Sequence, residues 1–441
     1  MKAKYILIPA LLIFVVILGS WFCINRENIG VFSEQSSAKS EIQQSFEESS
    51  EEASELESSV EESSEISTES SQEESSEQPG SRKASAEDLA VIQNYKTKYF
   101  VKKMTDEQKY YFVELYSAAL NFEESAVFYA PIPEDDLTTL MYLLNYDCPE
   151  MIHISGDYFP EYTGKDLKYV SSVKLNYVMD KKKYQTAMSE LRNFFDNLKK
   201  TLDSKTDLEK EKYVYDDIFD NCIYNDTNEL SGSVYSTLIS HFGRCEGFCK
   251  SFMWCMRELG VETLSVSGPQ NWDSGSAYAE HSWNIIKLDG KYYHVDITVD
   301  NVQGNTDGHN PPNYGFFNVN DAAISGSRTI NEVYTDLGVP ECNSMELNYH
   351  IMNDSYVTSG EASKEKIFKL IEKSFNTDGI KALSIKFESK EDYENILLNI
   401  NSWVSEYITG YSEEAYTYTN YYNNLSQSIV IDAKHTTTEG Q

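Results

Sequence analysis

Basic residues are scarce in this chain of 441 residues. Lys and Arg together number 37 against 71 Asp and Glu, which leaves a formal net charge of -34. A general nucleic-acid binder must neutralise phosphates with Lys and Arg, so this charge excludes that class of protein. The same deficit disfavours docking on an anionic membrane surface, because such docking depends on clusters of basic side chains.

Cysteine is too sparse for a disulfide framework. Seven Cys form an odd number spread over a long chain, whereas proteins held by disulfides are small and have their cysteines in pairs. No C-x-x-C sequence occurs, and this disfavours a structural zinc site. We therefore expect neither a metal nor another cofactor.

The chain begins with a short basic stretch followed by a long apolar run. Lys2 and Lys4 precede residues 5–24, which are almost wholly apolar. A run of about 20 such residues can cross a bilayer as a helix. Because the basic residues mainly precede the run, we expect the N-terminus to face the cytoplasm.

Three interpretations of residues 1–30 remain open. The length of the apolar run favours an uncleaved signal-anchor, and the small residues Gly19 and Ser20 allow a cleaved signal peptide. A lipoprotein attached at Cys23 is the third. Each interpretation exports the rest of the chain, so we expect a single-pass cell-membrane protein with its folded part outside, or a secreted protein if the signal is cleaved.

Ser and Glu dominate residues 31–83. Between Glu34 and Glu77 there are 15 Glu and a single Lys. Such a segment cannot bury enough apolar surface to offset its chain entropy, and its charges repel one another. We therefore expect a disordered, extended linker between the membrane segment and the folded part.

Helical periodicity characterises the N-terminal part of the folded chain, residues 84–203. Thr105 and Gln108 have the spacing of a capping box, and so do Thr206 and Glu209 farther along. The pattern predicts helices at residues 86–99, 105–122, 184–202 and from 206 to about 222.

The composition changes again near the C-terminus. Helical and strand patterns alternate at residues 364–375 (helix), 381–387 (strand), 391–408 (helix) and 426–433 (strand). This alternation predicts a small α+β module at residues 346–441.

A cysteine stands at a predicted helix start near the middle of the chain. Apolar residues recur at helical spacing after Cys245, and Gly260 is placed to end that helix. Free N–H groups and the helix dipole stabilise negative charge at a helix start, which favours the thiolate that acyl transfer needs. The same amides offer donors for an oxyanion. We assign the nucleophile to Cys245, with Cys249 as the lesser alternative and Cys255 as a core residue.

Two apolar-rich runs flank Asp289-Gly290, a pair typical of a two-residue hairpin turn. Such a turn pairs Leu288 with Lys291. Since strand side chains alternate between faces, four polar or aromatic residues then share one face. They are His281, Trp283, His294 and Asp296.

Within that set, His281 and Asp296 are diagonal neighbours across the two strands. A carboxylate that binds one imidazole nitrogen fixes the tautomer and leaves the other nitrogen to face the thiol. The register therefore predicts a His281–Asp296 pair beside Cys245. His294 lies nearer the turn, and we assign both it and Trp283 to packing.

These segments resemble the transglutaminase-like superfamily, over roughly residues 208–321. The matching blocks are Gly243-x-Cys245-Glu246-Gly247-Phe248, Gly260-Val261, His281-x-Trp283-Asn284 and Asp289-Gly290-Lys291-Tyr292-Tyr293-His294-Val295-Asp296-Ile297-Thr298. The resemblance implies a papain-like α+β core at residues 204–345, in which a helix bearing the Cys packs on an antiparallel sheet bearing His and Asp. Cys245 matches the nucleophile, His281 the base and Asp296 the orienting carboxylate. Val299 is a departure, because many members have Trp there.

The resemblance also implies the reaction. Members of this family attack an amide carbonyl with Cys and form a thioester, which an amine converts to a cross-link and water hydrolyses. An exported enzyme of this kind, whether a transglutaminase-like acyltransferase or a cysteine protease, would act on a surface protein or a cell-wall peptide. The alternative is a catalytically silent binding or scaffold module at the cell surface.

Overall fold

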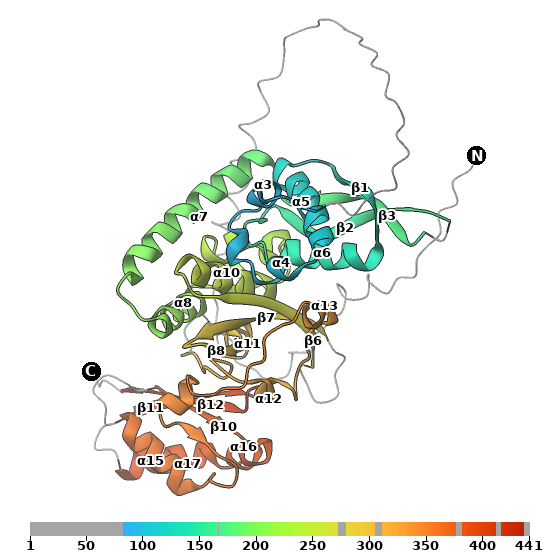
Figure 1. Cartoon of the computed structure of the whole chain (residues 1–441). Helices are drawn as coiled ribbons and strands as arrows, with labels where there is room; N and C mark the ends of the chain where they lie inside the picture. Colours follow the sequence, from blue (N-terminus) through green and yellow to red (C-terminus); the bar gives the residue numbers. More distant parts are fainter. Residues whose placement is uncertain are drawn as a thin grey trace, which may run out of the picture. The chain divides into compact units, whose positions relative to one another are not determined.

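The structure is a computed structural model that describes residues 83–165, 167–271, 279–304, 311–375, 382–411 and 416–435 (Figure 1). All of them belong to one compact unit, Pro79–Gln441. The predicted membrane segment and nearly all of the predicted Ser/Glu linker lie outside the described residues. In the part of the chain that is described, no helix combines the length and the apolar character that crossing a membrane requires.

The N-terminal part of the unit combines helices with a small antiparallel sheet in the order β1-β3-β2. Thr105 and Gln108 form the predicted capping box at the start of α5. The elements are α3 (Ala86–Ala90), η1 (Tyr95–Thr97), α4 (Tyr99–Lys103), α5 (Asp106–Asn121), β1 (Ser125–Pro133), α6 (Glu134–Tyr146), β2 (Ile154–Thr163) and β3 (Tyr169–Tyr177).

Two features of this region differ from the sequence prediction. The single helix expected at residues 86–99 is wrong, because Asn94 adopts a left-handed conformation (φ 52°) that interrupts the helical path. The three-stranded sheet was not predicted at all. Its strand β2 contains Gly156 and Pro160 and is half-exposed along its length, so no clean alternation of apolar and polar residues marks it as a strand.

The central part places a helix against a second antiparallel sheet, in the order β6-β7-β8. Helix α10 packs on β6 and β7 (Figure 1), and Thr206 with Glu209 forms the predicted capping box of α8. The elements are α7 (Lys181–Leu202), α8 (Asp207–Asn221), β4 (Ile223–Tyr224), η2 (Glu229–Gly232), α9 (Val234–Leu238), β5 (Phe242–Gly243), α10 (Cys245–Glu258), β6 (Thr263–Gln270), β7 (Ala279–Leu288), β8 (Lys291–Val295), α11 (Ile297–Gly304), α12 (Asp321–Ile324), α13 (Glu332–Asp336) and α14 (Tyr349–Met352).

The β7–β8 hairpin has the predicted register. Leu288 pairs with Lys291, and both turn residues have positive φ, 49° at Asp289 and 79° at Gly290. Positive φ at both positions is the geometry of a type I′ turn, which matches the twist of the flanking strands. His294 pairs with Ile285, so it shares a sheet face with the odd-numbered residues of β7.

The C-terminal part is the α+β arrangement that the sequence predicts, with a sheet in the order β11-β12-β10-β9. The helix expected at residues 391–408 is two helices. Asn399 N donates to Ile396 O, which tightens the end of the first helix, and Trp403 N donates to Asn399 O in the second. The elements are β9 (Tyr356–Val357), α15 (Lys364–Phe375), β10 (Ala382–Phe387), α16 (Lys390–Leu397), α17 (Ile400–Tyr411), β11 (Tyr416–Asn423) and β12 (Ser428–His435).

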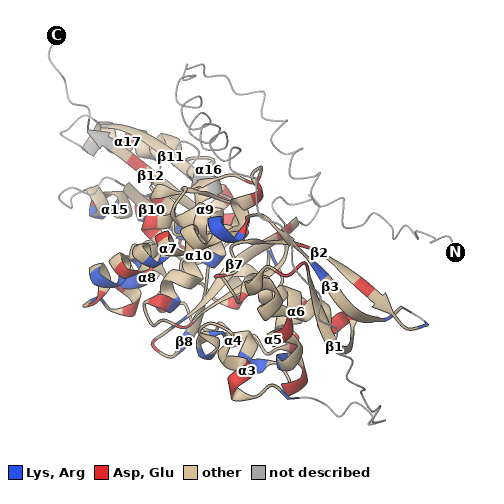
Figure 2. Ribbon diagram, turned by 90° about the horizontal axis from the view of Figure 1, so that it is seen from above, with Lys and Arg blue, Asp and Glu red and all other residues tan. Residues whose placement is uncertain are grey.

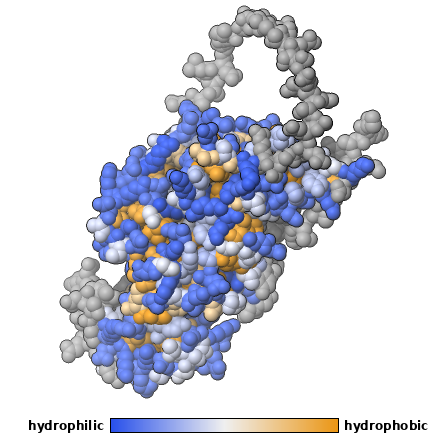
Figure 3. All heavy atoms as spheres, viewed as in Figure 1, coloured by the Kyte–Doolittle hydropathy of each residue, from blue (hydrophilic) through white to orange (hydrophobic). Residues whose placement is uncertain are grey.

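Charges of both signs are interspersed on the described surface. Helix α8 carries Lys beside Asp and Glu (Figure 2), with ion pairs such as Lys210–Asp207 at 2.8 Å. The face drawn in Figure 3 is mostly hydrophilic, with apolar residues gathered in separate patches. The described surface therefore mixes acidic groups with their counter-charges, unlike the Glu-rich sequence of residues 34–77.

Candidate active site

Cys245 is the first residue of α10, directly after the extended N-cap residue Arg244. The first N–H groups of a helix have no carbonyl partner within it, so the helix itself leaves the Cys245 amide available as a donor. The thiol is half-buried, whereas the other five described cysteines are all buried. Cys245 is therefore partly accessible to solvent, and it lies at the positive end of the α10 helix dipole.

The helix start is held close to the preceding loop. Arg244 N donates to Ser231 O at 2.9 Å. A Cβ on Gly247 would lie 2.4 Å from that same Ser231 carbonyl oxygen, so only glycine allows the first turn of α10 to approach η2 this closely. This contact gives the Gly247 of the Cys-Glu-Gly motif a structural role.

Glu246 is a buried carboxylate immediately after the nucleophile. It accepts from Arg244 Nη2 at 2.7 Å and from Lys250 Nζ at 2.8 Å. Burial alone would raise the pKa of Glu246, but the Lys250 ammonium and the Arg244 guanidinium outweigh it and lower the pKa to about 2. The residue after the nucleophile is thus an ionised carboxylate held by Arg244 and Lys250. The sequence pattern did not indicate this ion-pair network.

His281 and Asp296 meet as the hairpin register predicts. His281 Nε2 lies 2.8 Å from Asp296 Oδ2, and both side chains are buried. Burial lowers the pKa of His281, but the Asp296 carboxylate outweighs it, and a hydrogen bond with the Cys245 side chain raises the pKa further. Since Asp296 holds Nε2, Nδ1 is the ring nitrogen left for Cys245. The structure therefore brings all three predicted residues together.

Asp296 has a second partner that sequence reasoning missed. The Arg328 guanidinium donates to Asp296 Oδ2, and its carbon atom Cζ lies 4.5 Å from the ring centre of Phe316 and 5.1 Å from that of Trp283. Burial raises the pKa of Asp296, but His281 and Arg328 outweigh it, so the pKa falls below its usual range. Asp296 therefore stays ionised and is held from two sides.

Trp283 and His294 support the pair from the same face of the hairpin. The Trp283 ring stacks with His281 at 6.1 Å between ring centres and an interplanar angle of 13°. Its indole Nε1 donates to His294 Nδ1 at 3.1 Å, and His294 Nε2 lies 2.8 Å from Asp321 Oδ1. These hydrogen bonds hold the Trp283 ring in place, and the His281 ring stacks on it.

Cys249, the lesser candidate nucleophile, points elsewhere. Its sulfur donates to the Trp283 carbonyl oxygen at 3.1 Å and is buried. Burial raises the pKa of this thiol well above its usual range. Cys249 thus packs α10 against β7 and does not face His281 as Cys245 does.

One group of metal-ligand residue types lies together among the described residues. Ligand atoms of His294, Asp321 and Cys342 lie within 4.8 Å of one another. Because the Trp283 N–H can only donate, His294 Nδ1 must accept, and Nε2 then carries the ring hydrogen toward Asp321. A neutral imidazole in this tautomer has no lone pair left for a cation, so these contacts favour a hydrogen-bonded relay over a metal site.

We expect limiting iodoacetamide near pH 6 to alkylate Cys245 before any other described cysteine. Its thiol is half-buried beside His281, while the others are buried and burial raises the pKa of each of those thiols. Peptide mapping after partial labelling measures the order of reaction, with unfolded protein as the control in which access is equal. Preferential labelling of Cys249 or Cys342 would contradict the assignment.

The fold and the site define an α+β protein with a cysteine at a helix start facing a histidine–aspartate pair on an antiparallel sheet. Residues 196–297 match the family model of the transglutaminase-like superfamily, and they form a transglutaminase-like domain. No curated protein matches the chain.

Solved structures that are similar to the chain include three at low identity. One is a TGase, with 12% identity, a TM-score of 0.24, and coverage of 42% of this chain and 52% of that one. A candidate cysteine protease from Cytophaga hutchinsonii has 13% identity, a TM-score of 0.21, and coverage of 30% and 51%. A candidate protease from Parabacteroides distasonis ATCC 8503 has 11% identity, a TM-score of 0.20, and coverage of 32% and 36%. This chain thus spans about half, or less, of each structure's length.

Proposed function

We propose that the protein catalyses cysteine-dependent acyl transfer on protein or peptide amides, with Cys245 as nucleophile, His281 as base and Asp296 as orienting carboxylate. One observation carries the proposal. The buried His281 is held at Nε2 by Asp296, which leaves Nδ1 for the half-buried Cys245, a side chain close enough to raise the pKa of His281. This is the arrangement that an activated thiol requires.

The reaction runs in two halves. His281 takes the thiol proton, Sγ of Cys245 attacks the amide carbonyl carbon, and the π electrons move to oxygen. As the carbonyl re-forms, the C–N bond breaks and the imidazolium gives its proton to the leaving nitrogen. A primary amine or water then attacks the thioester, loses its proton to His281, and releases the sulfur as thiolate. An amine yields a cross-link, and water yields hydrolysis.

The place of action is part of the same proposal. The apolar run at residues 5–24 and the Ser/Glu-rich residues 31–83 support a membrane segment and an extended linker. The folded unit would then work outside the membrane. Its substrates would be surface proteins or cell-wall peptides.

The test is incubation of the full chain in detergent with a cell-surface extract and a fluorescent primary amine. Labelled protein that depends on Cys245 supports transfer, whereas new amino groups without labelling support hydrolysis. The Cys245→Ala variant provides the blank for both readouts. If the wild-type chain and this variant give the same signals, acyl transfer is overturned in favour of a catalytically silent module.

A further inference from the structure

The last residue of α6, Tyr146, lies at the candidate active site although it is about 100 residues away in sequence. Its hydroxyl oxygen accepts a hydrogen bond from Ser282 Oγ at 3.4 Å, and Ser282 directly follows His281. Burial raises the pKa of Tyr146, and negative charge on Glu246 and Cys245 raises it further. The phenol is therefore protonated and within electrostatic reach of the nucleophile.

The residues on either side of Tyr146 fix it to the helix that carries Cys245. Asn145 Oδ1 accepts from Lys250 Nζ at 3.1 Å, and Asp147 Oδ1 accepts from Arg257 Nη2 at 2.5 Å. Lys250 and Arg257 both belong to α10. Two bonds to the same rigid helix, one before and one after Tyr146, hold its hydroxyl at a set position relative to Cys245.

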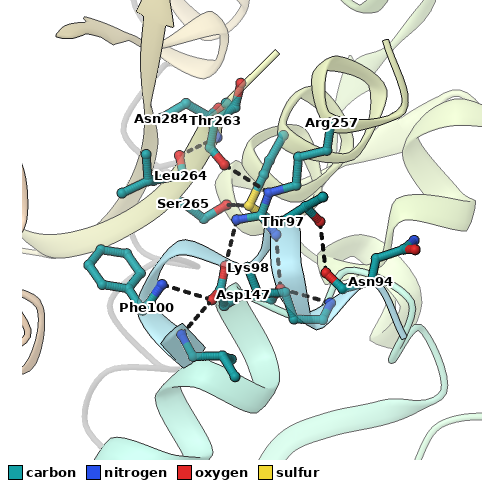
Figure 4. A network of polar contacts seen from close by, with 12 residues as sticks. Asn94, Thr97, Lys98, Phe100, Asp147, Arg257, Thr263, Leu264, Ser265 and Asn284 are labelled. Atoms are coloured by element: carbon teal, nitrogen blue, oxygen red, sulfur yellow. Dashed lines mark hydrogen bonds and ion pairs between the residues drawn. The ribbon is translucent and has the colours of Figure 1, made fainter. Parts of the chain in front are cut away.

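Asp147 is itself held firmly. Its Oδ2 accepts from the backbone N–H groups of Phe100 and Val101, each at 3.1 Å, while Oδ1 receives Arg257 (Figure 4). Arg257 Nε also donates to Thr263 O at 2.8 Å, which ties α10 to the start of β6. The end of α6 is therefore fixed to α10, the helix that carries Cys245, and α10 is in turn fixed to the sheet, as pre-organised catalytic groups require.

The direction of the Ser282 bond decides what the phenol can do. Because the Tyr146 oxygen accepts that bond, its own hydrogen remains to be donated. Attack by Cys245 places negative charge on the carbonyl oxygen, and the Cys245 backbone N–H supplies only one donor to it. We propose that the Tyr146 hydroxyl supplies a second donor and is a catalytic residue of the acyl transfer. This inference rests on the proposed function.

The test compares two reactions of the same thiol. Tyr146→Phe removes the hydroxyl and keeps the ring, so we expect acylation of Cys245 by a peptide amide to slow by about 10²–10³-fold, the usual effect of removing one oxyanion donor. Alkylation by iodoacetamide displaces iodide from a CH₂ group and forms no oxyanion. We expect its rate to stay unchanged. Tyr142→Phe is the matched control, because the Tyr142 ring stacks on Tyr146 at 6.1 Å and its hydroxyl has no part in the proposal.

The outcomes separate the two hypotheses. If the wild-type full chain is alkylated at Cys245 but is never acylated, the proposed function fails and the oxyanion role fails with it. If the wild type is acylated and Tyr146→Phe is acylated equally fast, only the role of Tyr146 is overturned. An equal change in both reactions would also overturn it, since the hydroxyl would then position the thiol. Selective loss of acylation supports it.

Discussion

His281→Gln is expected to slow single-turnover acylation of Cys245 by a peptide amide at least about 10⁴-fold, because an amide side chain cannot take the thiol proton or return it to the leaving nitrogen. Glutamine can still hydrogen-bond Asp296, which now holds His281 Nε2 at 2.8 Å. The loss would therefore report the missing base chemistry more than a disordered site. Rapid-quench detection of the thioester measures the rate.

The matched control is the other histidine on the same face of the hairpin. His294 binds Trp283 and Asp321 and has no bond to Cys245 among the described contacts. We expect His294→Gln to cost far less in acylation rate, through a small shift of the Trp283 ring beneath His281. If His294→Gln abolished acylation while His281→Gln did not, the base would be misassigned.

Asp296→Asn is expected to reduce the same rate by about 10⁴-fold, as loss of the orienting carboxylate does in serine triads. Asparagine can offer the imidazole a hydrogen bond but no charge to stabilise the imidazolium. The structure adds a second effect, because Arg328 is a buried cation whose carboxylate partner is Asp296. Leaving the Arg328 cation without the Asp296 charge should lower the free energy of unfolding by on the order of 3 kcal/mol. Urea denaturation measures this change.

A double variant separates the two effects. Arg328→Met added to Asp296→Asn removes the orphaned cation, and the thioether can fill the space between Phe316 and Trp283. We expect much of the lost stability to return while acylation stays slow. Recovery of the rate together with the stability would mean that Asp296 acts through folding and not through His281.

The chain's local chemistry determined several features by itself. The capping boxes at Thr105 and Thr206 form as predicted, because the side chain and the amide that it binds are three residues apart. Asp289-Gly290 set the register of the hairpin, since few other residue pairs adopt positive φ at both turn positions. That register was enough to place His281 diagonally across from Asp296, and His294 nearer the turn.

Other features of the site depended on contacts that no local pattern encodes. Arg328 follows Asp296 by 32 residues, and Ser282 is 136 residues from Tyr146. Neither Arg328 nor Tyr146 belongs to a motif, and each reaches the site through the packing of a separate segment. The β1-β3-β2 sheet was missed for the same reason, because a strand such as β2 is stabilised mainly by pairing with its neighbour.

The sequence by itself thus determined which residues could carry the chemistry and the register that pairs two of them. The tertiary structure decided what surrounds them: the Arg328 cation on Asp296 and the Tyr146 hydroxyl beside Ser282. The physical reason is the sequence separation of the interacting residues. Caps and turns are fixed by backbone geometry over a few residues. The burial of Arg328 and Tyr146 and their contacts arise only when distant segments pack together and exclude water.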